Sequence, residues 1–253
     1  MYCAKMVNQQ KLRTFLAAFP QTTSFWVAFS GGLDSQVLLH ALSQVVPRTR
    51  LRALHIDHGW HEEAKVWAKA CQDYCVKQAI ACEVIAVNAQ PQPGESPEAA
   101  ARQSRYHAFA TRLPLGDGLI MAHHQDDQAE TVLLQLLRGS GLKGLAAMSE
   151  VMPFAEGLLL RPFLNLTRAD LLVYAQQHSL SWIEDHSNFD LRFNRNFIRH
   201  QVMPLLKQRW PALHKTLARV AAHSAEAQQL LDERGQEDYQ TASGYINCVF
   251  RHS

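Results

Sequence analysis

The stretch FWVAFSGGLDS, residues 25–35, decides how the first half of the chain folds. Residues 25–29 are all apolar, which predicts a buried strand. Gly31 and Gly32 follow in a loop, and residues 37–45 then place apolar side chains on one helical face. A strand, a glycine turn and a helix in this order are typical of the parallel sheets of α/β proteins.

The same alternation of strand and helix recurs three more times. Residues 51–57, 82–87 and 118–122 predict strands, and helical patterns follow each of them, the last over residues 126–138. Ser96 followed by proline marks the start of one of these helices. We therefore expect an α/β fold with a doubly wound, mainly parallel sheet, helices on both faces and a helical C-terminal extension.

The second half of the chain has more helical patterns. Thr167, three residues before Asp170, predicts a capped helix, and the last helical pattern reaches about Glu233. We expect residues 1–212 to form the main domain and residues 213–253 a helical extension and tail.

Composition limits the class of protein. The chain has 253 residues, of which 47% are hydrophobic and 19% charged, a balance that excludes disordered and collagen-like proteins. No apolar run approaches the ~20 residues that cross a bilayer. Five unevenly spaced cysteines indicate reduced thiols and a cytoplasmic protein. Cys71, Cys75 and Cys82 would suit a three-thiolate metal cluster, but we favour core packing because no C-x-x-C pair occurs.

The loop at residues 30–35 is suited to phosphate. Backbone amides at a helix N-terminus bind anions, glycines allow close approach, and two serines add hydroxyl donors. The string is neither a Walker A loop nor a Rossmann fingerprint, and a capped glycine turn is the simpler alternative. The residues expected to bind phosphate are Ser30, Gly31, Gly32, Leu33, Asp34 and Ser35.

Acidic side chains follow the fourth predicted strand. The string HHQDDQAE, residues 123–130, lies at the carboxyl edge of the sheet, where ligands bind in open α/β folds. Its carboxylates would suit a hard cation such as Mg²⁺. The alternative is that Asp126 caps a helix and Glu130 is a solvated acid of the first turn.

Taken together, these motifs resemble a known family. The loop resembles the PP-loop of the N-type ATP pyrophosphatases, which cleave ATP between the α and β phosphates. With HIDHG at 55–59, RQSRY at 102–106, DHSN at 185–188 and RNFIR at 195–199, the chain resembles the tRNA(Ile)-lysidine synthetases over roughly residues 25–206.

The resemblance implies an ATP-dependent carbon–nitrogen ligase. Members of that family adenylate the wobble cytidine of tRNA(Ile) with a CAU anticodon, and the side-chain amine of free L-lysine then displaces AMP. The expected products are lysidine, AMP and pyrophosphate, and the expected cofactors are ATP and Mg²⁺.

The resemblance also implies roles for individual residues. Residues 30–35 would hold the ATP phosphates, and Asp34 and Asp127 would bind Mg²⁺. Arg102 or Arg105 would meet the charge that develops during adenylation. His123 would contact the base or the adenylate, and Glu130 would take a proton from lysine. The expected catalytic residues are therefore Asp34, Arg102, Arg105, His123, Asp127 and Glu130.

Residues 190–219 carry seven basic side chains against one acidic one. With aromatic residues between them and this family resemblance, Arg192, Arg195 and Arg199 are expected to contact the tRNA backbone, although a solvated helix face is the simpler alternative. His55, His58 and His61 have a spacing that suggests zinc, but we favour structural or nucleotide-contacting roles because a strand and turn need not bring them together.

The sequence departs from the family pattern at two points, and two alternative functions remain open. Trp60 and His61 stand where the family more often shows Leu-Arg. The chain ends at Ser253, whereas long members have further C-terminal domains, so it is either a short form or a fragment; residues 245–251 would begin another strand. A thiolating 2-thiocytidine synthetase and a non-catalytic tRNA-binding fragment are the competing functions. The oligomeric state does not follow from the sequence.

Overall fold

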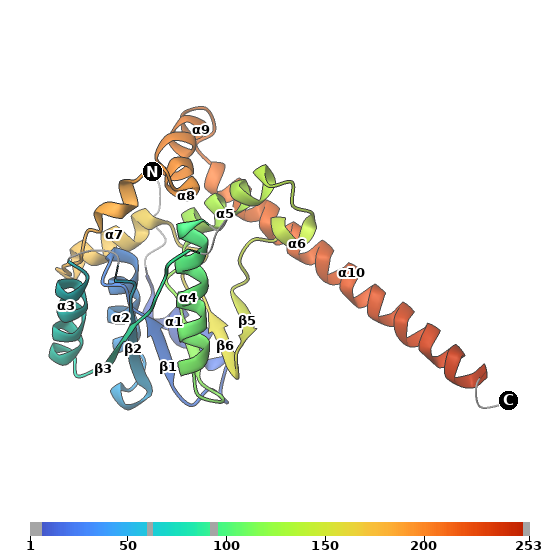
Figure 1. Ribbon diagram of the computed structural model, residues 1–253, viewed down its shortest axis with the longest axis horizontal. Helices are drawn as coiled ribbons and strands as arrows, with labels where there is room; N and C mark the ends of the chain where they lie inside the picture. Colours follow the sequence, from blue (N-terminus) through green and yellow to red (C-terminus); the bar gives the residue numbers. More distant parts are fainter. Residues whose placement is uncertain (1–6, 60–62, 92–95, 250–253) are drawn as a thin grey trace. The chain divides into compact units, whose positions relative to one another are not determined.

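The computed structural model describes residues 7–59, 63–91 and 96–249 (Figure 1). The chain forms two compact units. The first combines Met1–Asp126 with Ser149–Asn196, and the second combines Asp127–Met148 with Phe197–Ser253. The boundary that we expected between a main domain (residues 1–212) and a helical extension (residues 213–253) stays a prediction.

The first unit is built on a six-stranded sheet in the order β3-β2-β1-β4-β6-β5. Every pairing in this sheet is parallel except that of β5 with β6. The mainly parallel α/β sheet expected from the sequence is therefore confirmed. The strands are β1 (Phe25–Ala28), β2 (Leu51–Asp57), β3 (Ala81–Ala86), β4 (Gly118–Ile120), β5 (Val151–Phe154) and β6 (Gly157–Leu160).

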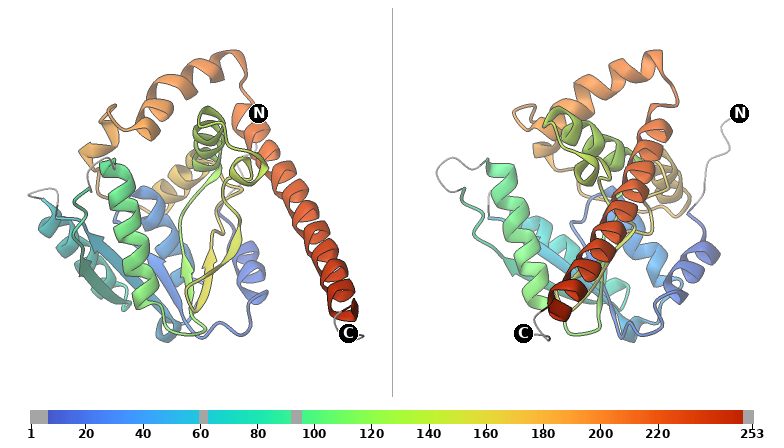
Figure 2. Two further views of the ribbon diagram at one scale, coloured as in Figure 1. Left: turned by 45° about the vertical axis from the view of Figure 1, so that its right-hand side comes forward. Right: turned by 90° about the vertical axis from the view of Figure 1, so that its right-hand side faces the viewer.

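Helices cover both faces of the sheet. Successive residues of a strand point to opposite faces, and in this sheet both faces carry apolar side chains that helices bury. In β1, Val27 packs into one apolar cluster with residues of α1, α2, α3 and α7. Its neighbour Trp26 packs on the other side with Phe109 of α4. α1 and α4 accordingly lie on opposite sides of the sheet in Figure 2. The helices of this unit are α1 (Gln9–Ala17), α2 (Leu33–Ser43), α3 (Ala64–Lys77), α4 (Pro97–Arg112) and α7 (Arg168–Gln177), with short 3₁₀ turns η1 (Arg48–Arg50) and η2 (His186–Phe189).

The sequence did not predict the hairpin of β5 and β6. Both strands have only four residues, and Pro153 stands within β5. Proline cannot donate a hydrogen bond to a neighbouring strand and is tolerated where the strand lies at the edge of a sheet. β5 is such an edge strand.

The second unit is helical. Its core contains Ala129, Ile198 and Met203, which are almost fully buried, with Leu213 and Leu217 packed against them. Its elements are α5 (Gln125–Leu137), which begins in the first unit, α6 (Leu142–Leu145), the π-helical turn η3 (Ile198–Val202), α9 (Met203–Arg209) and α10 (Leu213–Val249); the short α8 (Asn194–Phe197) lies at the boundary of the units.

The end of the chain differs from expectation. α10 has 37 residues and continues well beyond Glu233, where the sequence pattern was expected to end. Residues 245–249 are helical, so the strand expected over residues 245–251 is wrong for the part described. A strand needs a neighbour to satisfy its backbone, whereas a helix pairs its amides with its own carbonyls.

The loop between β1 and α2 depends on a left-handed glycine. Gly31 has φ +82°, and a Cβ at this position would lie 2.7 Å from Ile183 Cδ1 and 2.8 Å from Cys71 Sγ. The Gly31 carbonyl also accepts a hydrogen bond from the Ile183 amide at 2.9 Å. Backbone conformation and packing therefore both require glycine here.

We expect Gly31→Ala to lower the free energy of unfolding by about 3 kcal/mol or more, because backbone strain and overpacking add. Gly116→Ala is the matched control. Gly116 has φ +79°, but its added Cβ would meet Thr23 Oγ1 at an ordinary 3.8 Å. The free energy of unfolding of the control should fall by only about 1–2 kcal/mol, the cost of the backbone strain alone. Urea denaturation measures both losses, and equal losses would contradict the packing argument.

Candidate functional site

The loop of residues 30–35 leaves the start of α2 open to an anion. Gly32 is the N-cap residue of α2 and supplies no side-chain cap to the first-turn amides. Ser35 Oγ donates to the Gly32 carbonyl at 3.0 Å and lies 3.1 Å from Ser30 Oγ. The two serines thus fix the loop with hydroxyl groups that also suit phosphate oxygens.

Asp34 lies in the first turn of α2, beside this loop. Its Oδ1 atom is buried and has no hydrogen-bond partner among the described residues. Its Oδ2 atom lies 3.5 Å from Nε2 of His124, a histidine whose side chain is only 1% exposed. A buried carboxylate oxygen without a partner is costly, and a bound cation or hydrogen-bond donor would remove that cost.

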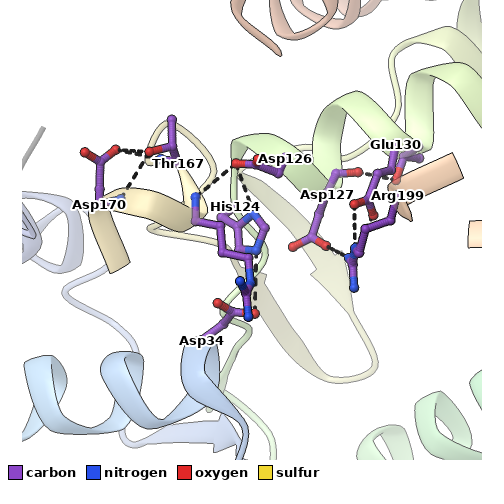
Figure 3. A network of polar contacts seen from close by, with 10 residues as sticks. Asp34, His124, Asp126, Asp127, Glu130, Thr167, Asp170 and Arg199 are labelled. Atoms are coloured by element: carbon purple, nitrogen blue, oxygen red, sulfur yellow. Dashed lines mark hydrogen bonds and ion pairs between the residues drawn. The ribbon is translucent and has the colours of Figure 1, made fainter. Parts of the chain in front are cut away.

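His124 connects Asp34 to a second carboxylate. Its Nδ1 atom lies 3.8 Å from Asp126 Oδ2, and Figure 3 shows the imidazole between Asp34 and Asp126. Asp126 Oδ2 accepts the Arg168 amide at 2.9 Å, so Asp126 caps the start of α7 beside the Thr167–Asp170 capping box. The sequence alternative made Asp126 a cap of the helix that begins near residue 126, whereas the hydrogen bond at Arg168 makes it a cap of α7.

In the second unit, Asp127, Glu130 and Arg199 form one ion-paired group (Figure 3). Arg199 donates to both oxygens of Glu130, at 2.7 and 2.8 Å, and to Asp127 Oδ1 at 3.1 Å. The Glu130 side chain is 3% exposed. Arg199 stands in the π-helical turn η3, a distortion frequent at functional sites. The roles expected for these residues, in tRNA, Mg²⁺ and lysine binding, stay predictions.

Asp34 belongs to the first unit and Asp127 to the second. The expectation that they share a magnesium ion therefore also stays a prediction.

Arg102 and Arg105 stand on α4 in a basic environment. Arg102 donates to the Tyr106 hydroxyl at 3.2 Å and lies over its ring. Burial lowers the pKa of Arg105, and the neighbouring charges of Arg102 and Arg195 lower it further. Burial, with Arg105 next in effect, also lowers the pKa of His58 to about 4, so His58 is neutral at pH 7. Such a concentration of positive charge favours an anionic ligand.

Of the other two histidines in the zinc spacing, His55 lies among the described residues. Nδ1 of buried His55 lies 2.9 Å from the Phe29 carbonyl, which is the structural role favoured from the sequence. His61 lies outside the described residues, as does Trp60. In the part of the chain described here, no group of three or more histidine, cysteine or acidic side chains is arranged to hold a metal ion.

Cys71, Cys75 and Cys82 are free thiols. Cys71 and Cys75 are buried in the main core, as favoured from the sequence, and Cys82 is partly buried against it. A hydrogen bond with Cys75 lowers the pKa of Cys82.

Of the expected tRNA-binding residues, Arg192 is exposed and pairs with Asp190.

Within residues 7–59, 63–91 and 96–249, no helix is long and apolar enough to cross a membrane.

Sequence reasoning missed two residues of the site. His124, the neighbour of His123, lies against Asp34, and nothing in the sequence distinguishes these adjacent histidines. Arg161 donates from Nε to His123 Nδ1 at 3.2 Å. Its position directly after β6 would have been a signal, but β6 itself was not predicted.

Comparison with known proteins assigns the class. A family model described as the PP-loop domain matches residues 4–206, and the chain belongs to this family. The fold is also that of the U34-tRNA thiolase NcsA from Methanococcus maripaludis, with a TM-score of 0.69 at 16% identity over 86% of this chain and 77% of that one.

More similar relatives are curated as tRNA(Ile)-lysidine synthases. The protein of Methylococcus capsulatus is 49% identical over 87% of this chain and 51% of its own length. That of Coxiella burnetii is 45% identical over 91% of this chain and 52% of its own length. That of Xanthomonas axonopodis is 52% identical over 81% of this chain and 47% of its own length. The chain thus spans about half the length of these relatives.

We expect Arg199→Met to lower the free energy of unfolding by about 2–4 kcal/mol, because the buried Glu130 carboxylate loses its cation. Adding Glu130→Gln removes that charge and should recover part of the loss. Arg192→Met, at an exposed arginine, is the control and should cause no measurable change. Urea denaturation of the variants tests this, and an equal loss in the single and double variants would contradict it.

Proposed function

We propose that this chain carries the ATP-dependent chemistry of a tRNA(Ile)-lysidine synthetase. In this reaction ATP adenylates the wobble cytidine of tRNA(Ile) and releases pyrophosphate. The side-chain amine of L-lysine then attacks the activated carbon, AMP leaves, and the nitrogen loses a proton. The membership of the PP-loop family and the names of relatives 45–52% identical to the chain support this proposal.

The observation that carries the proposal is the pairing of an open helix N-terminus with Asp34. First-turn amides without a side-chain cap suit phosphate oxygens, and the buried, unpartnered Oδ1 of Asp34 suits a cation that accompanies phosphate. Oxygen ligands are what Mg²⁺ requires, so the residues present fit this ion. When bound, Mg²⁺ neutralises charge on the phosphate oxygens.

The chain's own residues supply the remaining chemistry. Arg102 and Arg105 stabilise negative charge as pyrophosphate separates, and the burial of Arg105 strengthens its field. Asp127 is proposed as a further Mg²⁺ ligand. Glu130 accepts the proton that the lysine ammonium must lose before it attacks. Arg195 supplies positive charge for the RNA backbone. A cytoplasmic location, where thiols stay reduced, belongs to the same proposal.

Mass spectrometry of a tRNA(Ile) anticodon transcript, incubated with ATP, Mg²⁺ and lysine, tests the function. We expect the mass of lysidine with the wild-type chain. Asp34→Asn should reduce product formation by at least about 100-fold, because the amide cannot replace a carboxylate beside phosphate. Asp73→Asn changes an exposed carboxylate of α3 that pairs with Lys69, and it should retain wild-type activity.

Other products would reject the proposal. Incorporation of sulfur in place of lysine would support the 2-thiocytidine synthetase. Tight tRNA binding without any change in RNA mass would identify a binding fragment. Full activity of Asp34→Asn would reject the role of the carboxylate.

A further inference from the structure

Arg161 is a buried arginine at the carboxyl edge of the sheet. It directly follows β6, and Leu160 of that strand pairs with Ile120 of β4. His123 comes three residues after Ile120, so parallel pairing brings the two side chains to neighbouring strand ends. Only 3% of Arg161 is exposed.

The contacts of Arg161 are unusual for a buried cation. Its Nη1 donates to the Ser149 carbonyl at 2.6 Å, and Nη2 lies 3.8 Å from Met152 Sδ. Burial lowers the pKa of Arg161, whereas a hydrogen bond with Tyr106 opposes that change. Among the described residues, no carboxylate forms an ion pair with it. Arginines buried this deeply are normally paired with an acid, so its contact with an imidazole needs a reason.

The third nitrogen, Nε, points at the ring of His123. The distance from Arg161 Nε to His123 Nδ1 is 3.2 Å. Every nitrogen of a guanidinium is a donor and none is an acceptor. His123 Nδ1 must therefore accept with its lone pair, which it can do only when it carries no proton. The proton of the neutral ring then belongs to Nε2.

We propose that Arg161 is a positioning residue that holds His123 in the Nε2–H tautomer. His123 then presents a hydrogen-bond donor and not a base. Given the proposed function, on which this last step rests, its partner is an acceptor oxygen of the bound nucleotide, either a carbonyl or a phosphoryl oxygen. A preorganised neutral donor stabilises charge that develops on such an oxygen during group transfer.

The tautomer role of Arg161 can be distinguished from a role in packing alone. A packing role would be satisfied by any long side chain that fills the same space. The tautomer role requires a donor within reach of His123 Nδ1. Lysine carries such a donor, Nζ, one bond beyond the position of Nε, whereas methionine carries none. Arg161→Met and Arg161→Lys therefore separate the two roles.

Nitrogen NMR of the histidine rings measures the tautomer directly. The chain is labelled with ¹⁵N-histidine, and His123→Gln identifies the signals of His123. At mildly alkaline pH we expect Nδ1 of the wild-type ring to give the signal of an unprotonated nitrogen and Nε2 that of a protonated one. Arg161→Met should give averaged signals from both tautomers, and Arg161→Lys should restore the wild-type pattern.

Two results would overturn the proposal. One is a protonated Nδ1 in the wild-type chain. The other is a wild-type pattern in Arg161→Met. If the methionine variant does not fold, the wild-type spectrum and the lysine variant still decide the question. Arg112→Met, which removes an exposed arginine paired with Glu83, controls for loss of positive charge in the first unit.

Kinetics add a second readout. In lysidine formation, Arg161→Met should reduce kcat by roughly 10- to 100-fold, the usual effect of losing a partner that orients a functional imidazole, and leave KM for ATP nearly unchanged. Arg161→Lys should recover part of the loss. A chain that forms no lysidine at all would reject the proposed function, yet the ring spectra would still test the tautomer.

Discussion

The left-handed backbone of Gly31 is the constraint on which the proposed phosphate site depends. A positive φ turns the chain sharply between β1 and α2, and that turn places the first amides of α2 at the carboxyl edge of the sheet. Ile183 and Cys71 occupy the space that a side chain would need. Packing and a backbone hydrogen bond at Gly31 therefore hold the loop, and the first-turn amides of α2, which have no side-chain cap, remain open to a ligand.

A buried histidine extends this constraint to the rest of the first unit. His124 lies between the carboxylates of Asp34 and Asp126, and Asp126 in turn accepts an amide at the start of α7. One polar connection thus joins α2, the end of β4 and α7. Because His124 is buried, its contacts with these carboxylates are little screened by solvent. This contact favours one orientation of Asp34, which is what preorganisation of the proposed site requires.

The sequence predicted the parts of this architecture that repeat a strong local pattern. The four parallel strands, the glycine loop and the capped α4 and α7 all follow from apolar periodicity and capping residues. The hairpin of β5 and β6 was missed because four-residue strands, one of them with Pro153, give little periodic signal. Arg161 was missed with it, since a residue's place at a strand end has meaning only once the strand is known.

The polar partnerships were less predictable than the elements. Asp127, Glu130 and Arg199 were expected from three separate arguments, yet they form one group of ion pairs. Residues about 70 positions apart meet only through tertiary packing, which no local pattern encodes. The same reason explains why the sequence pointed to His123 alone. The sequence places both histidines at the edge of the sheet, and only the packing of the folded chain brings His124 against Asp34.

The central claim is that residues 30–35 bind the phosphates of ATP through the open start of α2. Amide NMR of the ¹⁵N-labelled chain, titrated with ATP and Mg²⁺, tests it most directly. The account predicts that the amides of Gly31 to Ser35 shift most, and that the same titration of Asp34→Asn gives much smaller shifts at equal ATP. Saturable shifts concentrated elsewhere in the chain, with these loop amides unmoved, would contradict it.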